Sequence, residues 1–575
     1  MPLKTEVFLS IGGDGSLDSQ ELTKELELLA DEKLQDFHDF LSRASVGLED
    51  DLDWWVSRFS SRNCFTSPLF LNLLTISLVD RAADAGRPFS IRTDSFFLFL
   101  IYRNLYRNKG LPRWKVRWSP EYIKIIPNQV KLCLFIALSP LFLIFTLVAG
   151  RSYARKPVVQ EEIDLFSCFA TPEWWANDTD RYFPRLTSHY SADRLKTVYF
   201  LPRAVGNKNW WRLREENQKY RGGDKNVLIL EDHITIKDCL FSWSHCIRVL
   251  KIKPKILMWD GIGVDWLYYK EYTSPSSLLV SMKSILYYRF VKNLRNSYVG
   301  IRSFTNFFEN QAFDKALHKG IKDFFPATKN VGYEGYSPVT TYYCSFPVQN
   351  EYDSGVLPDV LALPGKGFRS YTDKFVDGLE TVIVPHLRGS SLYTHSGNDM
   401  VTGDWKVLIA LPHTSADWWF FLDLASQIKL NYGDRVDVCI KPHPIVKSSY
   451  LHHLMDRRGL LDQVEIVGGD ITGLITQSRL LISSASGVLI ESIALGVPVA
   501  IMRIPEKFMY NPIPPNVPRS LWISCDDADM LLCYMESLLN ESYEKATDRA
   551  RLSSYVLDLF YEPVSRRALD RILPS

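Results

Sequence analysis

Short apolar runs alternate with helical stretches along most of this chain, and this alternation constrains the fold more than any other feature. From about residue 160 the runs include "EIDLFSCFA", "KTVYFLPRA", "KNVLILED", "PKILMWDG", "NSYVGIRSF" and "KNVGYEGY". A second series follows, with "WKVLIALP", "RVDVCIKPHP", "QVEIVGG", "RLLISSAS" and "VPVAIM". Strands that alternate with helices form parallel sheets in α/β folds. We therefore predict two α/β units, with a boundary near residue 400.

The length and charge of the chain fit several globular domains. Its 575 residues are too many for one hydrophobic core, and its net charge of +1 argues against a nucleic-acid binder with a broad basic surface. The nine cysteines include no CxxC pair, which argues against a zinc site or a disulfide framework. Before the first series, residues 15–130 are expected to be mostly helical, with "DSQELTKELELLADEKLQDFHDFLSRA" as the clearest amphipathic run.

One hydrophobic segment differs from the rest of the chain. The stretch "KLCLFIALSPLFLIFTLVAGRSYARK" carries no charge from Leu132 to Gly150, and basic residues flank it. That length is enough to cross a bilayer, and the basic flank suits a cytoplasmic face. Soluble-looking sequence on both sides makes a crossing awkward, and Pro140 favours a kink or a break. We expect a shallow or re-entrant insertion over residues 131–156, at the cytoplasmic face of the inner membrane. A buried core helix is the alternative.

The motif "KPHP" follows the predicted strand "VDVCI". Ligands of open α/β sheets bind beyond the carboxyl ends of the strands. Because Pro442 and Pro444 fix their own φ angles, the loop is stiff and holds His443 in a preset direction, next to Lys441. These two side chains are candidate ligands, although a structural turn would need the same stiffness. His413, in "ALPHTSAD", also follows a predicted strand. It either lines the cleft or has a capping or structural role in its loop.

A second motif, "LISSASGVLIESIALGVPVAI", is typical of a strand, a turn, a helix and another strand. Hydroxyls and free N–H groups at a helix N-terminus suit an anionic phosphate, and a carboxylate one turn later can accept hydrogen bonds from ribose hydroxyls. Helix capping by the serines is the alternative. Together with "KPHP" the motif predicts a nucleotide-sugar site. Its candidate residues here are Ser483, Ser484, Ser486, Gly487 and Glu491.

The order of "KPHP" and then "SSASGVLIESIALGVPV" resembles the donor domain of GT-B glycosyltransferases. It is similar to bacterial sialyl-, polysialyl- and Kdo-transferases and to CDP-glycerol glycerophosphotransferases. The resemblance to the sialyltransferases implies that His443, Ser483 and Ser484 bind the donor phosphate. It also implies a GT-B-like α/β fold, in which two Rossmann-like domains face a cleft.

Most of residues 54–560 also resembles a bacterial family of surface carbohydrate (O-antigen-type) biosynthesis proteins. The stretches that carry this resemblance are "WWVSRFSSRNCFTSPLF", "FFENQAFDKAL", "GYEGYSPVTTYY" and "LPDVLALPG". The family more often has Trp where this chain has Phe313. The resemblance implies surface polysaccharide assembly, with a nucleotide-sugar donor and a glycan or lipid-linked acceptor, and it does not name the sugar.

An inverting transfer needs a base for the acceptor hydroxyl and positive charge or hydrogen-bond donors for the leaving phosphate. No metal or cofactor is expected if the protein supplies that charge. The sialyltransferases use an acidic residue in a motif that this chain lacks in clean form. Three candidates end or closely follow predicted strands: Asp260, Glu309 and Glu334. Glu309 is preferred, because its polar triplet interrupts an aromatic stretch.

The expected organisation has four parts. A helical region covers 1–130 and the membrane-associated segment 131–156; an acceptor domain covers 157–400 and a donor domain 401–575. The predicted function is glycosyl transfer to a growing surface polysaccharide or lipid-linked glycan. Two alternatives stay open: a nucleotide-sugar epimerase with the same fold, and a non-catalytic component of a polysaccharide assembly complex.

Overall fold

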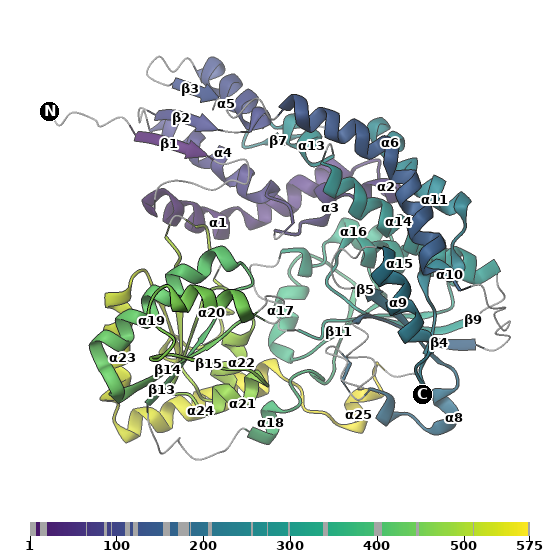
Figure 1. Ribbon diagram of the computed structural model, residues 1–575. Coiled ribbons are helices and arrows are strands. Elements are labelled where there is room, and N and C mark those ends of the chain that lie inside the picture. Colours follow the sequence, from purple (N-terminus) through teal and green to yellow (C-terminus); the bar gives the residue numbers. More distant parts are fainter. Residues whose placement is uncertain are drawn as a thin grey trace.

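The computed structural model describes most of the chain between Val7 and Ile572 and shows an α/β protein (Figure 1). The residues outside the description are 1–6, 12–19, 65, 86–88, 94, 110–114, 119–124, 153–161, 171–182, 185, 205–209, 253, 255, 256, 273, 297–299, 337–342, 396–404, 444–447, 506, 510 and 573–575.

The second α/β unit contains a six-stranded sheet in the order β15-β14-β13-β16-β17-β18, and every pair of neighbours is parallel. Numbered along the chain, this order is 3-2-1-4-5-6, the doubly wound order of dinucleotide-binding domains. The helices α19 (Trp418–Tyr432), α20 (Ser448–Asp456), α22 (Val488–Ala494) and α23 (Ala528–Leu539) connect or follow the strands. The strands are β13 (Trp405–Ala410), β14 (Val436–Lys441), β15 (Glu465–Ile466), β16 (Leu480–Ser483), β17 (Val499–Met502) and β18 (Trp522–Cys525).

The first α/β unit contains a seven-stranded parallel sheet in the order β12-β11-β10-β9-β4-β5-β6. Read from β6, it repeats the order 3-2-1-4-5-6 and adds one strand. The helices α14 (Pro275–Asn296) and α15 (Ala312–Phe324) pack against each other beside it. The strands are β4 (Glu162–Ala170), β5 (Val198–Ala204), β6 (Asn226–Val227), β9 (Gly300–Phe307), β10 (Lys329–Tyr333), β11 (Val360–Leu363) and β12 (Glu380–Ile383). The two sheets confirm the predicted α/β class.

Two predicted strands of the first series differ from the structure: one is much shorter than predicted, and the other lies outside the large sheet. In "KNVLILED" only β6 is extended, and Leu230–His233 forms a short helix, α10. In "PKILMWDG" the strand β7 (Met258–Trp259) pairs antiparallel with β8 (Ile262–Gly263), outside the large sheet. The Asp260–Gly261 turn explains this hairpin, because both residues have positive φ, 48° and 78°, as the tight turns of hairpins require.

The helical N-terminal region is not an independent domain. Its main helices are α1 (Gln20–Ser45), α4 (Leu69–Asp84) and α5 (Phe96–Lys109), and it also holds a parallel sheet of β1 (Val7–Ile11), β2 (Phe89–Thr93) and β3 (Lys115–Trp118), which was not predicted. One hydrophobic core runs from α1 through α14 to the first sheet. Buried Arg62 also donates two hydrogen bonds to the Glu351 carboxylate, 2.7 and 2.8 Å long. The expected boundary near residue 130 therefore cuts through a shared core.

The C-terminal end of the chain returns from the second unit to the first. After α24 (Tyr543–Phe560), the main chain of Glu562 bonds to His386 and to Pro364, both from the first unit. Leu569 in α25 (Arg566–Leu569) joins the core on one face of the first sheet. The crossing is tight at Gly365, where an added Cβ would lie 2.3 Å from the Phe560 carbonyl carbon. The glycine of "LPDVLALPG" is thus fixed by packing. The predicted boundary itself lies at residue 400, outside the described residues.

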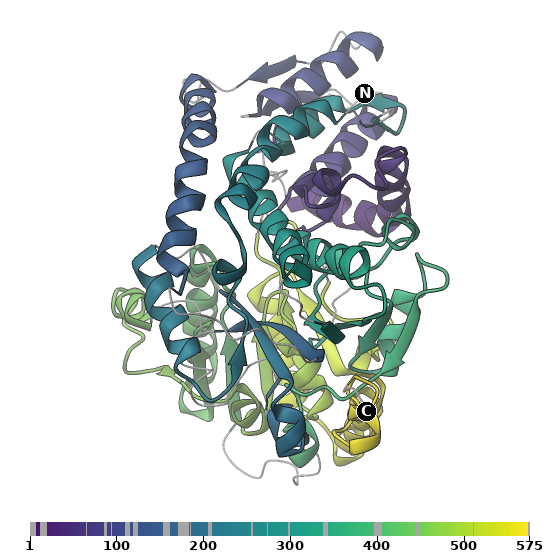
Figure 2. The ribbon, with the colours of Figure 1, turned by 90° about the vertical axis from the view of Figure 1, so that its right-hand side faces the viewer.

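The hydrophobic segment forms one helix, α6 (Ile125–Gly150), which Pro140 does not interrupt. Figure 2 shows this helix along one edge of the molecule. Val130–Gly150 is long and apolar enough to cross a membrane, and only 17% of it is buried. Ser139, Leu143 and Leu147, four residues apart, form its buried face. A re-entrant insertion needs two arms, so the re-entrant form of the expectation is wrong, whereas a shallow insertion stays a prediction. The alternative of a buried core helix is also wrong, because most of the helix surface is exposed.

Candidate functional site

The strand order of the second sheet marks one place where a ligand is expected. The chain connections run in opposite directions from β13 and β16, and open α/β sheets bind ligands in the crevice beyond the carboxyl ends of such a pair. Pro412, His413 and Thr414 follow β13, and Ser484 and Ala485 follow β16. All five line one cavity of about 630 Å³, which we call the central cavity.

Two histidines lie together at this edge of the sheet. The ring centroids of His413 and His443 are 6.2 Å apart, nearly edge to face. The indole N–H of Trp418, a buried residue, donates a 2.8 Å hydrogen bond to the Pro412 carbonyl and so fixes the loop that carries His413. Lys441 Nζ instead donates to the Gly469 carbonyl over 2.7 Å, and burial lowers its pKa. Lys441 therefore links the end of β14 to the loop that follows β15.

The serines of the second motif have separate positions. Ser483 is buried and donates a 2.7 Å hydrogen bond to the Ala410 carbonyl, joining β16 to β13. Ser484 is also largely buried, but it lines the central cavity. Ser486 and Gly487 lead into α22, which has seven residues.

Glu491 lies in the first turn of α22, as the motif predicts. It does not line the central cavity. Its carboxylate is 3.8 Å from the guanidinium of Arg388, which follows β12 at the junction of the two units. A contact with the donor ribose stays a prediction for this residue.

The opposite wall of the central cavity comes from the N-terminal region and from α13 (Asp265–Tyr272). Arg58 and Glu271 are paired there, with 3.3 Å between Nε and Oε2, and neither atom makes a hydrogen bond of good geometry within the described part of the chain. The Glu271 side chain is 3% exposed, and burial raises its pKa. Lys270 and Lys507 add positive charge to the cavity wall, and Lys507 is paired with Asp417.

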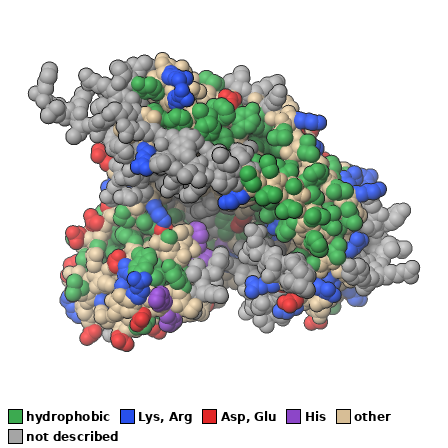
Figure 3. Space-filling view, turned by 45° about the horizontal axis from the view of Figure 1, so that its top comes forward, with side chains coloured by type: hydrophobic (Ala, Val, Ile, Leu, Met, Phe, Trp, Pro, Cys, Tyr) green, Lys and Arg blue, Asp and Glu red, His purple; other side chains and the backbone are tan. Residues whose placement is uncertain are grey.

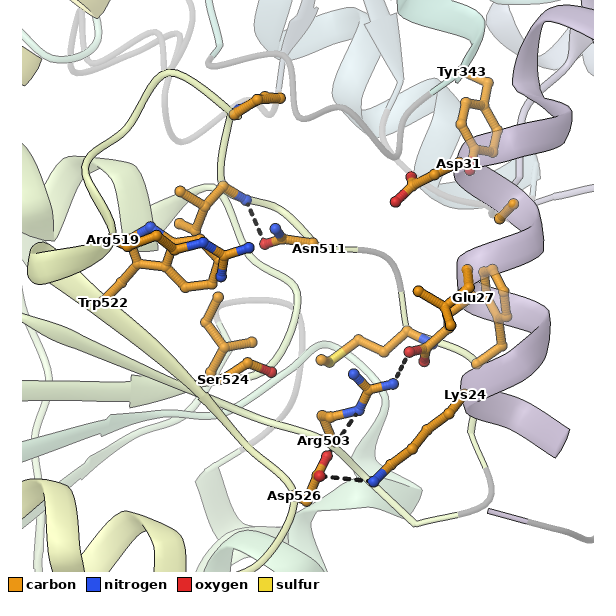
Figure 4. Close-up of a pocket in the computed structure, with 17 residues that line it drawn as sticks. Lys24, Glu27, Asp31, Tyr343, Arg503, Asn511, Arg519, Trp522, Ser524 and Asp526 are labelled. Atoms are coloured by element: carbon orange, nitrogen blue, oxygen red, sulfur yellow. Dashed lines mark hydrogen bonds and ion pairs between the residues drawn. The ribbon is translucent and has the colours of Figure 1, made fainter. Parts of the chain in front are cut away.

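Two further cavities continue the central one along the carboxyl edges of the sheets. The first, of about 690 Å³, shares Phe508 and Met509 with it and lies between α1 and the ends of β17 and β18 (Figure 4). In Figure 4, Arg503 lies between Glu27 of α1 and Asp526, and it is paired with both. The N-terminal region therefore closes over the second sheet.

The other cavity, of about 530 Å³, shares Arg58 and Thr66 with the central one. We call it the first-sheet cavity. It lies at the carboxyl ends of β4 and β5 in the first sheet. Its most buried charge, Arg203, is stacked between the rings of Phe169 and Phe313, with 4.3 Å to each centroid. The edges of the two sheets thus open toward the same cleft.

Glu309 follows β9, which together with β4 forms the point of divergence in the first sheet. Buried Asp314 accepts hydrogen bonds from the backbone N–H groups of Glu309 and Gln311 and from Arg203. Burial raises the pKa of Asp314 to about 6. The loop is strained at Asn310, with φ of 52°. Gln311 donates to the Glu309 carboxylate and itself lines the first-sheet cavity, so Glu309 lies one hydrogen bond behind that cavity.

Glu334 follows the next strand, β10, and is fully buried. Burial raises its pKa to about 8, and its Oε1 has no hydrogen-bond partner among the described residues. The nearby Tyr336 hydroxyl has a raised pKa because of burial and then because of the charges of Glu334 and Glu309. The charges of both candidates therefore act on the same tyrosine hydroxyl.

The third acidic candidate, Asp260, lies elsewhere. It occupies the turn of the β7–β8 hairpin, where it pairs with Lys33 of α1 at 2.8 Å and accepts a hydrogen bond from Ser77 of α4. The expectation that it follows a strand of the parallel sheet is wrong, because the Asp-Gly turn reverses the chain there. Its contacts join the hairpin to the N-terminal helices.

No family model matches the chain, and no curated protein matches it. Solved structures with some likeness include UDP-GlcNAc 2-epimerase from Neisseria meningitidis bound to UDP-GlcNAc, at 11% identity and a TM-score of 0.40, covering 68% of this chain and 94% of that one. The wall teichoic acid polymerase TagF has 10% identity and a TM-score of 0.39, covering 78% and 96%. MurG from Acinetobacter baumannii has 10% identity and a TM-score of 0.38, covering 71% and 99%. At these values the likeness assigns no activity to this chain.

Sequence reasoning underestimated His413 and missed Arg58 and Glu271. The position of His413 at the site could have been predicted, because the first strand of a doubly wound sheet always borders the point of divergence. Arg58 and Glu271 had none, because they lie far from the donor motifs in sequence and reach the cavity only through the packing of α13 against α3 (Arg58–Ser61). Among the described residues, no group of three His, Cys, Asp or Glu side chains could hold a metal ion.

Proposed function

We propose that this chain is a glycosyltransferase that moves a sugar from a nucleotide-activated donor to a growing surface polysaccharide or lipid-linked glycan. The central cavity is the observation that carries this proposal. His413 and Ser484 line it at the point of strand divergence, His443 lies beside His413, and cationic side chains occupy the opposite wall. Neutral hydrogen-bond donors and fixed positive charges are what a leaving nucleotide phosphate requires.

The donor phosphate is proposed to bind between His413, His443 and Ser484, with Arg58 and Lys270 facing it across the cavity. These side chains would stabilise the charge that develops on the phosphate, and this supports a transfer without a metal. Ser483 would act indirectly, by holding β16 against β13 through Ala410.

The acceptor is proposed to enter the first-sheet cavity. Two carboxylates can then take the proton of its hydroxyl. Glu309 is hydrogen-bonded to Gln311 at the first sheet. Glu271 lies in the wall of the central cavity, across from the residues proposed to bind the donor. Glu309 remains the predicted base, because only the Gln311 side chain separates it from the cavity that the acceptor would occupy. Glu271 is the second candidate, because it is buried and already lines the central cavity.

Thermal unfolding with candidate donors tests this function directly. A donor that binds the folded chain raises its melting temperature, so CMP-, UDP-, GDP- and CDP-linked sugars should be compared at equal concentration. We expect one base to stabilise the protein, and the matching donor to be consumed only with a glycan or lipid-linked acceptor. Conversion of the donor to another sugar without an acceptor would instead identify an epimerase. No stabilisation by any donor would contradict the donor site.

A further inference from the structure

The exposed side of α6 belongs to a larger apolar face. Seven large apolar side chains on this helix are 45–66% exposed, and they follow one another at helical spacing: Val130, Leu134, Leu138, Leu141, Phe142, Phe145 and Val148. Five more, 40–73% exposed, lie on α11 (Ile236–Trp243), α12 (His245–Arg248) and η3 (Val249–Lys251): Ile236, Leu240, Phe241, Ile247 and Leu250. Figure 3 shows hydrophobic side chains gathered over this side of the molecule. We call these twelve residues the apolar face.

The helix is attached to the protein along its length. Trp243 donates a 2.9 Å hydrogen bond to the Ile136 carbonyl, and the Cys239 thiol lies 3.8 Å from the Leu143 carbonyl oxygen. At the end of the helix, the Gly150 carbonyl accepts hydrogen bonds from Asn217 and Arg221. A helix that crossed a bilayer would have to break these contacts and leave the buried groups unpaired.

The exposed charges on the elements that carry the apolar face are basic. Lys131 and Arg151 flank the exposed part of α6, and Lys237 and Lys251 are exposed on the neighbouring elements. The only acidic residue in Ile125–Arg151 or Ile236–Lys251 is Asp238, which is buried and paired with Arg289 at 2.6 Å. Figure 3 shows Lys and Arg side chains at the margins of the apolar region. Large apolar side chains with a basic rim suit anionic lipid headgroups over acyl chains.

We propose that the apolar face binds the surface of an anionic lipid bilayer, with α6 lying in the plane of the membrane and still packed on α11. Binding then involves all four elements together, whereas a membrane-crossing α6 would act alone. This proposal does not depend on the proposed enzymatic function, because it needs neither donor nor acceptor.

Flotation of the purified full-length protein with lipid vesicles tests this proposal. We expect it to float with vesicles of phosphatidylcholine and phosphatidylglycerol, to float less with phosphatidylcholine alone, and to be partly released by salt. The double variant Leu138→Asp with Phe145→Asp changes α6, and Leu240→Asp with Leu250→Asp changes the neighbouring elements without touching α6. Each should lower the partition coefficient about tenfold or more, since each places two charges on the binding face.

Leu430→Asp is the matched control. Leu430 is 86% exposed on α19, in the other α/β unit, so its substitution should leave flotation unchanged. Unfolding temperatures of all variants should stay close to the original, because the changed side chains are exposed. Undiminished flotation of the Leu240→Asp, Leu250→Asp variant would overturn the proposal in favour of an anchor made by α6 alone. If the protein floats with neither vesicle type and instead forms a dimer that these substitutions dissociate, the apolar face binds a second copy of the chain and the proposal is overturned.

Discussion

His413 and His443 lie with their ring centroids 6.2 Å apart, although they follow different strands of the second sheet. The strands β13 and β14 are parallel neighbours, so their carboxyl ends meet at one edge and bring both imidazoles to the same side of the cleft. Donor binding is therefore expected to depend on the pair, not on the histidine of the "KPHP" motif alone.

Replacing either histidine by alanine should weaken donor binding. We expect a loss of about 1–3 kcal/mol for His443→Ala, the scale of a hydrogen bond to a charged group, and a similar loss for His413→Ala. Titration of the stabilising donor by calorimetry measures both. His453→Ala, on the exposed surface of α20, is the control and should bind normally. Unchanged affinity in both folded variants would remove the histidines from the site.

The two adjacent serines should separate stability from binding. Ser483→Ala removes a buried hydrogen bond to Ala410, so it should lower the free energy of unfolding by about 1 kcal/mol. Ser484→Ala should leave unfolding nearly unchanged and weaken donor binding, since Ser484 lines the central cavity. Chemical denaturation and donor titration of the same two proteins check this. If Ser483→Ala weakens donor binding and Ser484→Ala instead lowers the free energy of unfolding, Ser483 is the phosphate ligand.

Substitution of the acidic candidates should identify the base. A general base contributes about 10²–10⁴-fold to the rate, so Glu309→Gln should reduce transfer by that order with donor affinity near normal. Glu271→Gln is the direct competitor, and Asp260→Asn is the control, because Asp260 pairs with Lys33 away from the cavities. Transfer rates at saturating donor decide between them. If Glu271→Gln alone abolishes transfer, the base belongs to the central cavity.

The stability of the protein should fall as the pH rises toward 8, in part because of Glu334. Burial raises the pKa of this carboxyl from about 4.5 to about 8, so between these values the folded chain keeps a proton that the unfolded chain has lost. The folded state binds more protons, and its stability therefore decreases as the pH increases through this window.

Glu334→Gln keeps the shape of the side chain and removes this titration. The variant should have a flatter dependence of melting temperature on pH between 5 and 8, and it should be more stable than the original chain at pH 8. Thermal unfolding across this range measures the difference. Parallel curves for the Glu334 variant and the original chain would mean that Glu334 is ionised in the folded protein.

The sequence by itself determined the α/β class and the position of the sheet edge that carries His443 and Ser484. Apolar runs such as "VDVCI" and "LLIS" are short, buried and flanked by polar turns, so the strands β14 and β16 were predictable, and with them the exits that carry His443 and Ser484. The amphipathic pattern of α1 was readable for the same reason, because local periodicity reflects which side of an element is buried.

Only the tertiary structure decided which side chains meet. Glu271 and Arg58 reach the central cavity from helices of the N-terminal half, and Ser483 proved to bond to Ala410, because such contacts depend on packing between segments far apart in the chain. The hydrophobic stretch posed the same problem: its composition fits a crossing, a core helix or a surface helix equally well. The tertiary structure adds that Trp243, Cys239 and Asn217 contact one side of α6 and leave the other side exposed.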